Sequence, residues 1–536
     1  SISVLKGPAA AALYGSRGAN GVIMITTKKG KQGDAIVNFK ASYGVSSKAV
    51  EDYETVGAED YYKMTWTAIR NKAEADGRPD PDLFATQNLI PTLVYNAYDV
   101  AEPIGTDGEV VPGANLLWDT DWMDEILTTG QRQEYLFDIS GGDETSNYFM
   151  SLGYLLNEGI VPVSDFERFN ARVNLDKKLN DWFKAGINFS GSTSDQNYPT
   201  TEGSSYSNMI QFGRNMAPIY PVYLRNSDGS FITDSDGNKI YDYGMDSDGD
   251  GRPARPTDAY PNTNVLGGAE LDNQLYERDN VSFRTYGEID IIEGLKFKTN
   301  FSYDYYIYSQ HQYANPDYGY ARSYGGFSYK ARNRTEAYTF NNLLTYEKTI
   351  DDHSFNILAG HEAYLYKYHY LYTSRSAFPF GGLEELDAAA ATQSSSSYRE
   401  DHRVEGYLGR LEYNYAGRYY ISGSYRRDGS SRFHPDYRWG NFWSVGGSWR
   451  ISEEAFMSYD WLSNLKLKAS YGTLGNDQLL RWDGSNWVQN YYAYQGLYET
   501  GHDNLTDAGL LVYKLPNDKI SWEVSKTTNI GLEIGL

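Results

Sequence analysis

The chain has 536 residues, and its 48 Lys and Arg against 71 Asp and Glu give a formal charge of −23. This acidic balance argues against a nucleic-acid binder, because neutralising phosphates requires clustered basic side chains. The absence of cysteine excludes disulfide frameworks, thiolate nucleophiles and Cys-ligated metal sites. No run of about 18 apolar residues occurs, so the sequence predicts no transmembrane helix.

Aromatic residues are abundant: 50 Tyr, 21 Phe and 11 Trp make up 15% of the chain. Such side chains favour strands, and Tyr and Trp suit a boundary that is wet on one side and apolar on the other. The chain starts at Ser1 without Met or a signal segment and stops at Leu536 inside an alternating run. We therefore expect it to be a piece of a longer protein.

The first thirty residues differ in kind from the rest. A Gly-Pro pair and four alanines precede the glycine-punctuated stretch 15–21, and the apolar run 22–27 follows. Small residues allow close packing of the backbone, glycines permit tight turns, and the apolar run predicts a strand buried on both faces. The glycine spacing does not match that of a phosphate-binding loop.

Alternation of apolar and polar residues with period two recurs from residue 35 to the end. In one example, Phe169, Ala171, Val173 and Leu175 alternate with polar residues. Each such run predicts a strand with one buried face, and the runs amount to about fourteen strands, many about 9 to 13 residues long. Only one segment, 58–75, predicts a convincing helix, with Tyr62, Trp66, Ile69 and Ala73 on one stripe.

The predicted connections are of two kinds. Short turns are expected at 141–144, 179–181, 293–294, 351–353 and 416–418, and long loops at 46–132, 198–280, 310–330, 375–402 and 475–520. Two connections, 158–165 and 453–464, fit the alternation of short and long less well. Short turns at one rim and long loops at the other are typical of an outer-membrane barrel. A soluble meander or propeller is the alternative, but the polar loops contain nothing to cover the apolar faces.

Aromatic side chains in the long loops are the candidate ligand contacts. Their flat rings can stack on the apolar faces of sugars, although packing between loops or a partner interface would also explain them. These residues are Trp118, Trp122, Trp482, Trp487, Tyr491, Tyr492 and Tyr494. Strand tyrosines such as Tyr303, Tyr407, Tyr413 and Tyr471 are expected in the girdles at the membrane interfaces instead.

Asp246, Asp248 and Asp250 are the candidate metal ligands, because carboxylates at positions 1, 3 and 5 of a loop with Gly251 at position 6 can surround Ca²⁺. Thr257 stands at the twelfth position, where a bidentate Glu is needed, so an ordinary acidic loop is the other interpretation. No cofactor beyond this possible Ca²⁺ is predicted.

No catalytic constellation is present, and we expect no enzyme. His361-Glu362 lacks the second His of a zinc-protease motif, and no Gly-x-Ser-x-Gly elbow occurs.

Several stretches together resemble one protein family. Residues 4–15 (VLKGPAAAALYG), 16–21 (SRGANG) and 26–30 (TTKKG) are similar to the end of the plug domain of TonB-dependent outer-membrane receptors of the SusC/RagA branch, found in Bacteroidetes. The plug motif residues are Gly15, Arg17, Gly18, Asn20 and Gly21. Further matches keep the family's order at 141–142, 148–154, 158–160, 168–172, 425–433, 439–440, 449–454, 465–472, 475–476, 522–523 and 528–532.

The resemblance implies an all-β fold: an antiparallel transmembrane barrel of which about fourteen of 22 strands are here. Residues 1–33 would be the C-terminal end of the plug and residues 34–536 the N-terminal part of the barrel. An even set of fourteen strands could also close by itself. The motif Arg426-Arg427-Asp428, with Arg432, is diagnostic of the family. Ion pairs that brace the barrel rim explain it better than substrate binding does.

What the resemblance implies about function is active import across the outer membrane of a Gram-negative bacterium, without covalent chemistry. The nutrient would be an oligosaccharide, a SusD-like surface lipoprotein would act as a lid, and the TonB-ExbB-ExbD complex would pull on the plug. Import of a peptide, siderophore or vitamin by the same fold is one alternative, and a secreted β-rich glycan-binding protein that never enters lipid is another. The acidic excess in the loops fits a hydroxyl-rich or cationic ligand better than an anionic one.

Overall fold

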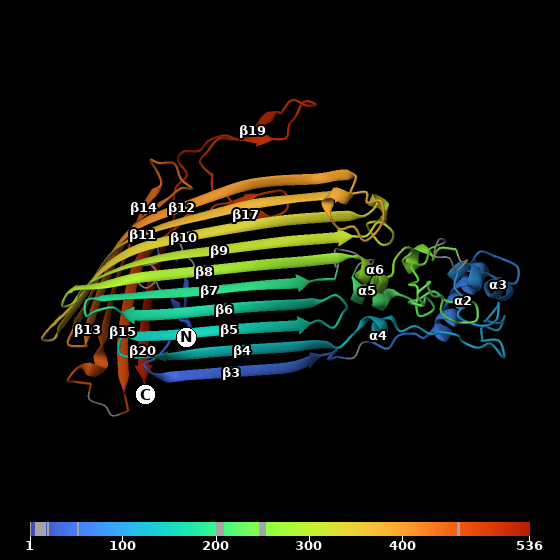
Figure 1. Ribbon diagram of the computed structural model, residues 1–536, viewed down its shortest axis with the longest axis horizontal. Helices are drawn as coiled ribbons and strands as arrows, with labels where there is room; N and C mark the ends of the chain where they lie inside the picture. The colour runs from blue at the N-terminus through green and yellow to red at the C-terminus, as the bar shows by residue number, and fades with distance from the viewer. Residues whose placement is uncertain are drawn as a thin grey trace.

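A single antiparallel sheet of fourteen strands dominates the structure (Figure 1). The computed structural model describes residues 2–5, 15, 18, 21–50, 53–199, 208–245, 253–457 and 461–536. The strands are β3 (Gly33–Ser46), β4 (Gly130–Gly142), β5 (Ser146–Glu158), β6 (Asp165–Lys178), β7 (Phe183–Asn197), β8 (Asn273–Ile292), β9 (Leu295–Ala314), β10 (Phe327–Ile350), β11 (His353–Ser376), β12 (Ala391–Tyr415), β13 (Tyr419–Ser430), β14 (Trp439–Arg450), β15 (Asn464–Asn476) and β20 (Glu523–Gly535). Every strand pairs with its predecessor in this series, so the predicted antiparallel architecture of about fourteen strands is confirmed.

The sheet has two edges, β3 and β20, which do not pair with each other within the described residues. Closing a sheet requires a tilt and a register stagger that suit the number of strands, and an unpaired edge leaves a row of backbone groups free for a further strand.

The two faces of the sheet differ in chemistry. Because directly opposed residues on neighbouring strands share a face, the register assigns each side chain to one of the two. One face, here called the outer face, exposes large apolar side chains along most strands, among them Phe39, Phe137, Leu152, Phe169, Ile187, Phe340, Ile421 and Val445. The opposite face, the inner face, carries serine, asparagine, charged residues and tyrosine. The predicted alternation thus produces an apolar face and a polar one.

The connections alternate between the two ends of the sheet, as predicted. Short turns at 143–145, 179–182, 293–294, 351–352 and 416–418 define the short-turn end. Long segments at 47–129, 198–272, 315–326, 377–390 and 477–522 lie at the other, long-loop end. The two predicted irregularities are also present, because the brief connection 159–164 falls at the long-loop end and the longer 451–463 at the short-turn end.

The prediction of strand lengths is wrong for the middle of the sheet. Strands β8 and β9 have 20 residues each, and β10, β11 and β12 have 24, 24 and 25. At about 3.3 Å per residue, 25 residues span about 80 Å, far more than a bilayer needs. The excess lies at the long-loop end, where residues 391–402 are strand rather than loop. Their run of serines gives no apolar alternation, and so the sequence pattern missed them.

Two of the long segments fold together into a compact helical unit, here called the loop domain (residues 58–126, 209–245 and 253–271), at the right of Figure 1. Its helices are α2 (Ala58–Ala75), α3 (Pro81–Leu93), α4 (Trp122–Ile126), α5 (Met209–Asn215) and α6 (Val265–Leu271). The predicted helix 58–75 matches α2, and its stripe residues Tyr62, Trp66 and Ala73 are buried. The Tyr62 hydroxyl donates to the Tyr95 carbonyl oxygen and accepts from the Ala97 amide, which fixes the chain after α3 against α2.

The remaining elements are small. Strands β1 (Ile2–Leu5) and β2 (Val22–Ile25) pair with each other apart from the main sheet, and the segment 477–522 carries the hairpins β16–β17 (Leu480–Trp482, Trp487–Gln489) and β18–β19 (Leu497–Thr500, Leu510–Lys514). Short 3₁₀ turns are η2 (Thr257–Ala259), η3 (Arg322–Tyr324), η4 (Leu386–Ala388) and η5 (Ile451–Glu453). Within the described part of the chain, every helix is too short or too polar to cross a membrane.

Candidate functional site

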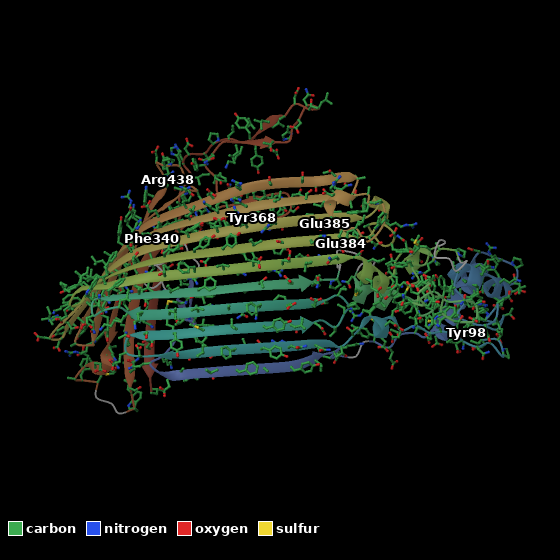
Figure 2. The ribbon with its side chains drawn as sticks, in the orientation of Figure 1. Tyr98, Phe340, Tyr368, Glu384, Glu385 and Arg438 are labelled. Atoms are coloured by element: carbon green, nitrogen blue, oxygen red, sulfur yellow. The ribbon has the colours of Figure 1, made fainter. Side chains whose placement is uncertain are left out.

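A row of five tyrosines on β11 is the most prominent feature of the inner face. Residues 364–372 read Tyr-Leu-Tyr-Lys-Tyr-His-Tyr-Leu-Tyr, so that every second side chain is a tyrosine. Period two places all five on one face of the strand. That face is the inner one, because Glu362, two residues earlier, contacts Arg426, which is buried on the inner side of β13. We call Tyr364, Tyr366, Tyr368, Tyr370 and Tyr372 the tyrosine row; Figure 2 marks its middle member, Tyr368.

Neighbouring strands extend the tyrosine row sideways. The Tyr370 ring lies 5.1 Å from that of Tyr398 on β12, measured between centroids, and its hydroxyl is 3.4 Å from the Tyr329 hydroxyl on β10. Farther along the sheet, Tyr276 and Tyr308 stack with centroids 6.0 Å apart on β8 and β9. The inner face at the long-loop end is therefore an aromatic wall with hydroxyl groups at its surface.

This wall is suited to binding a flexible, hydroxyl- or amide-bearing ligand. The tyrosines of the row are half-buried, so their rings are fixed by packing while part of each remains open. A cavity of about 600 Å³ opens beside the wall, lined in part by Gln310, Gln312, Tyr329 and Gln393. Tyrosine rings supply flat apolar contact at little entropic cost, and the hydroxyl and amide groups offer both donors and acceptors. A second cavity, of about 460 Å³, lies where the loop domain meets β8.

The sequence contained the signal for the tyrosine row. Five tyrosines at strict period two are visible in residues 364–372, but strand tyrosines as a class are also expected in the membrane girdles. The register of β11 with its neighbouring strands places the row on the inner face, and the sequence alone does not give this register. The tyrosines named for the girdles, Tyr303, Tyr407, Tyr413 and Tyr471, do lie on the outer face.

Trp118 and Trp122, predicted as ligand contacts, lie inside the loop domain. They are 6% and 2% exposed, and their indole nitrogens donate to the carbonyl oxygens of Ile219 and Tyr220 at 2.9 and 2.8 Å. Both therefore join the first long segment to the second. The structure favours the alternative interpretation of these two rings, packing between loops, because a buried indole has no free face for a ligand.

The aromatic residues predicted in segment 477–522 divide into two groups. Tyr491 is 9% exposed and packs between Tyr366 and His402, with centroids 6.0 and 5.5 Å away, while the Tyr492 hydroxyl accepts from the Asp401 amide. These contacts attach the segment to β11 and β12.

Tyr494 lies edge-on to His434 in the loop between β13 and β14, with centroids 5.7 Å apart. Trp482 and Trp487 pair across the β16–β17 hairpin and are 51% and 66% exposed. Their role in ligand contact stays a prediction.

Asp477, His402 and Ser430 form a buried polar cluster at the start of the same segment. The Ser430 hydroxyl donates to Asp477 Oδ2 at 2.8 Å, and His402 Nε2 lies 3.1 Å from that oxygen and 3.3 Å from Ser430 Oγ. The residue types are those of a hydrolase triad, but serine and aspartate both contact the same imidazole nitrogen. A triad needs them on opposite nitrogens, so this cluster anchors the segment instead.

The Arg426-Arg427-Asp428 motif has its side chains on alternate faces of β13. Arg426 and Asp428 point inward, are 3% and 0% exposed, and are joined by a 2.7 Å hydrogen bond from Arg426 Nε to Asp428 Oδ1. Arg427 points outward and lies over the Trp439 ring, 5.2 Å from its centroid. Glu362 on β11 extends the inner pair, at 3.3 Å from Arg426 Nη2. Arg426 and Asp428 of the motif thus form a buried ion-pair group with Glu362, while Arg427 lies on the outer face.

Gly15 of the predicted plug motif packs directly onto this ion-pair group. Its φ is +61°, and a Cβ added there would lie 2.4 Å from Arg426 Nε and 2.8 Å from Asp428 Oδ2. Only glycine fits both the backbone conformation and the space. Gly18 is buried, and its carbonyl oxygen accepts from the Gly21 amide at 3.0 Å. Arg17 and Asn20 lie outside the described residues, as do the candidate Ca²⁺ ligands Asp246, Asp248 and Asp250.

No protein-family model matches the chain. Three curated relatives align with all of it: TonB-dependent receptors P3 and P39 of Formosa agariphila, 27% and 26% identical over 544 and 546 residues, and TonB-dependent receptor SusC of Bacteroides thetaiotaomicron, 28% identical over 556 residues. The alignments cover 47%, 45% and 48% of those proteins. The chain spans about half the length of the curated relatives it matches.

Solved structures give the same result for the fold. The RagAB peptide transporter matches all of the chain and 57% of its own, with a TM-score of 0.75 and 24% identity. Its "open-open" state matches with a TM-score of 0.74 and 24% identity, covering all of the chain and 56% of its own. The predicted resemblance to SusC/RagA-like TonB-dependent receptors is confirmed along the whole chain.

Proposed function

We propose that the chain forms much of the barrel wall of a TonB-dependent importer in the outer membrane, and that the imported nutrient is an oligosaccharide. The observation that carries this proposal is the division of the sheet into an apolar outer face and an inner face with the tyrosine row. An importer needs both, a surface that lipid can cover and a polar interior that a ligand can follow.

The outer face supports a membrane location over a secreted glycan-binding protein. Phe39 is 68% exposed, Ile421 58% and Phe340 43%, on strands spread across the sheet. Leaving such a surface in water costs about 25 cal/mol for each Å² of apolar area. The loop domain lies at one end of the sheet and does not cover this face (Figure 1). Lipid is the covering that fits apolar residues exposed on one face of most strands.

The similarity to SusC and to the RagAB transporter supports two proposed partner proteins. We infer a SusD-like surface lipoprotein over the long-loop end and the TonB-ExbB-ExbD complex at the other. The described residues provide positioning and binding groups rather than a nucleophile with its base, so the work done on the ligand is capture and transfer. The ligand itself stays chemically unchanged.

The tyrosine row favours an oligosaccharide. Sugar rings present apolar faces that stack on tyrosine and a rim of hydroxyl groups that bond to Tyr, Gln and Asn side chains. A peptide is the second candidate, supported by the likeness of the fold to a peptide transporter. The same wall would then bind apolar side chains by stacking and the peptide backbone through Gln310, Gln312 and Gln393.

Uptake by the full-length receptor tests the proposal. The double variant Tyr368→Ala/Tyr370→Ala should lower uptake of a labelled oligosaccharide about tenfold or more, since stacking on an aromatic ring contributes on the order of 1 kcal/mol per ring. Tyr303→Ala, on the outer face of β9, is the matched control and should leave uptake unchanged. Uptake of peptides without uptake of an oligosaccharide would contradict the proposed substrate class. Failure of the receptor to enter the outer membrane would contradict the proposed importer function.

A further inference from the structure

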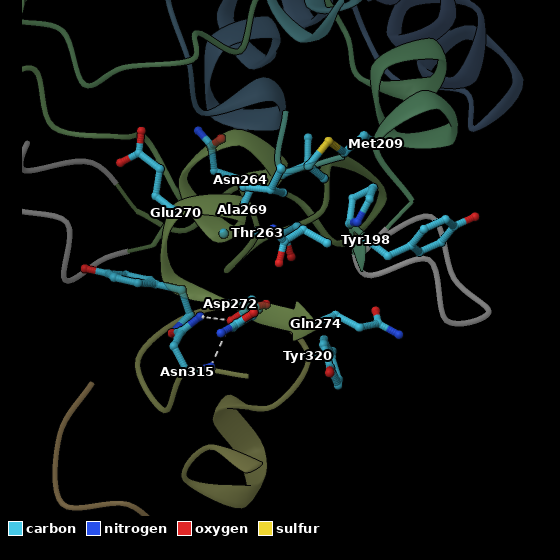
Figure 3. A pocket seen from close by; sticks show the side chains of 18 of the residues that line it. Tyr198, Met209, Thr263, Asn264, Ala269, Glu270, Asp272, Gln274, Asn315 and Tyr320 are labelled. Atoms are coloured by element: carbon cyan, nitrogen blue, oxygen red, sulfur yellow. Dashed lines mark hydrogen bonds between the residues drawn. The ribbon is translucent and has the colours of Figure 1, made fainter. Parts of the chain in front are cut away.

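The cavity of about 460 Å³ where the loop domain meets the sheet is lined by four acidic side chains (Figure 3). Asp165 opens β6, Glu270 lies on α6, Asp272 stands between α6 and β8, and Glu384 comes from the segment between β11 and β12. None of the described residues that line this cavity is Lys or Arg. Segments that are far apart in sequence therefore come together at this cavity, and the charged side chains that they contribute are all acidic.

Neutral groups hold these carboxylates in place. Asp272 Oδ1 accepts from the Asn315 backbone and side-chain nitrogens at 2.9 and 2.7 Å, bonds that Figure 3 draws as dashed lines. Glu270 accepts from the Tyr241 hydroxyl at 2.6 Å. Amide and phenol donors orient a carboxylate without cancelling its charge, which leaves the cavity negative.

The other two carboxylates follow the same pattern. Asp165 accepts from Asn197 Nδ2 at 3.1 Å, and Glu384 from Asn273 Nδ2 at 3.0 Å. The nearest basic group to Glu384 is the His311 imidazole, with Nδ1 at 3.7 Å. An imidazole is charged only when protonated, so at neutral pH it balances little of the negative charge.

Gln274 adds an acceptor that no protein group uses. The residue is 7% exposed and lines the cavity; its Nε2 donates to the Tyr276 hydroxyl, while its Oε1 is enclosed and has no partner. Buried amide oxygens in folded proteins are almost always bonded, because an unmet acceptor costs about 1–3 kcal/mol. A donor from a bound molecule would meet this need.

A metal ion does not fit the arrangement. Across the described ranges, no group of three or more His, Asp or Glu residues is close enough together to hold one. A cation in the cavity would instead be recognised through hydrogen bonds from its own donors to the carboxylate oxygens. A primary ammonium group, with three donors on one point charge, has that property.

We propose that this cavity binds a primary ammonium group of the imported ligand, with an adjoining hydroxyl or amide donor on Gln274 Oε1. The inference rests on the proposed function for the ligand's route and specifies its chemistry. Tyr198, Tyr318 and Tyr320 line the same cavity and would contact the carbon skeleton that carries the ammonium. An amino sugar and a lysine side chain share this chemistry, so the probes must separate them.

Binding to the full-length receptor in detergent, measured by calorimetry, tests the proposal with two matched pairs of probes. One pair is a glucosamine tetramer and its N-acetylated form, and the other is a lysine-containing tetrapeptide and its Nε-acetyl form. Acetylation removes the charge and two of the donors but little else. The free amine of at least one pair should bind about tenfold or more tightly than its acetylated form, as expected for a lost charge-assisted hydrogen bond.

Variants assign the effect to the cavity. Asp272→Asn should weaken binding of the free amine about tenfold and leave the acetylated probe unchanged. Gln274→Met removes the acceptor for the adjoining hydroxyl or amide donor, which both members of a pair carry, and should weaken both by a similar factor. Glu293→Gln, an exposed acid in a turn at the short-turn end, is the matched control and should change neither. Using two variants with different side chains guards against one that fails to fold, which heat-modifiable migration would reveal.

The outcomes separate this inference from the proposed function. Equal affinity for both members of each pair would overturn the ammonium site while uptake of an oligosaccharide could still be observed. If only the peptide pair shows a preference for the free amine, the result would support the ammonium site and contradict the oligosaccharide as substrate class. Loss of both free and acetylated binding in Asp272→Asn, with normal migration, would show a general role in packing and overturn the assignment.

Discussion

The buried ion pair between Arg426 and Asp428 provides the sharpest test of how the inner face is held together. Arg426→Met keeps most of the side-chain volume and removes the cation. Asp428, which is fully buried, would lose the 2.7 Å bond from Arg426 Nε, and Glu362 would lose a contact of 3.3 Å. Removing one partner of a buried pair costs about 3–5 kcal/mol, because the remaining charge is left uncompensated.

Arg427→Met is the matched control, one residue away on the opposite face. Arg427 lies over Trp439 at 5.2 Å, and a cation–π contact at such a site contributes about 0.5–1 kcal/mol. The free energy of unfolding of the full-length receptor, measured by guanidinium titration in detergent with tryptophan fluorescence, should therefore fall several times more for Arg426→Met than for Arg427→Met.

A double variant checks the cause of the loss. Adding Asp428→Asn to Arg426→Met removes the uncompensated charge, so the double variant should be more stable than Arg426→Met alone. If the two arginine variants lose equal stability, or if Asp428→Asn lowers stability further in the Arg426→Met background, the assignment of an ion pair as the stabilising contact is wrong.

Three further predictions concern other parts of the molecule. Gly15→Ala, at a φ of +61° and with its added Cβ too close to the Arg426 guanidinium and the Asp428 carboxylate, should cost about 1–2 kcal/mol or more and make the N-terminal segment easier to cleave with protease, whereas Gly44→Ala, with open space around it, should not. Leu89→Ala removes a fully buried side chain of α3 and should destabilise the loop domain by about 2–5 kcal/mol. Proteolysis at the long-loop end should then increase while the heat-modifiable migration of the barrel stays normal; if the barrel loses that migration as well, the two parts unfold as one. Burial raises the pKa of Asp272, which lies outside the strands, to about 6, so below this pH its carboxyl is neutral and above it charged beside Asp165, Glu270 and Glu384. Affinity for the glucosamine tetramer should therefore rise between pH 5 and pH 7 relative to its acetylated form, and Asp272→Asn should flatten that rise; an unchanged slope would show that another group controls it.

The sequence predicted the sheet because an apolar face and a polar face impose a period of two on its strands. It also predicted α2, whose Tyr62, Trp66 and Ala73 repeat at helical spacing on one buried stripe. It did not predict the extension of β12 through residues 394–397, since four consecutive serines carry no alternation. Helix α3 escaped notice for a similar reason, because Pro91 lies within it and proline normally interrupts a helix.

The candidate site was harder to predict because its parts are distant in sequence. Trp118 and Trp122 lie in a polar segment, and the sequence alone predicts them as ligand contacts. Their hydrogen bonds to Ile219 and Tyr220 cross about a hundred residues, and only the fold brings those carbonyl groups within reach. The acidic cavity combines residues from Asp165 to Glu384 and has no local motif at all. Nonlocal packing of this kind leaves no pattern that a single sequence reveals.

Strand β11 shows how one periodicity can serve two environments. Its even-numbered residues from Tyr364 to Tyr372 face inward, while Leu365 and Leu371 between them face outward. Because the side-chain period of a strand is two, a shift of register by one residue would turn the whole tyrosine row toward the outside. The buried group of Glu362, Arg426 and Asp428 lies at the start of this row and ties β11 to β13 across β12. Arg426 and Asp428 of the diagnostic motif and the tyrosine row therefore lie on one face of the sheet and share one register.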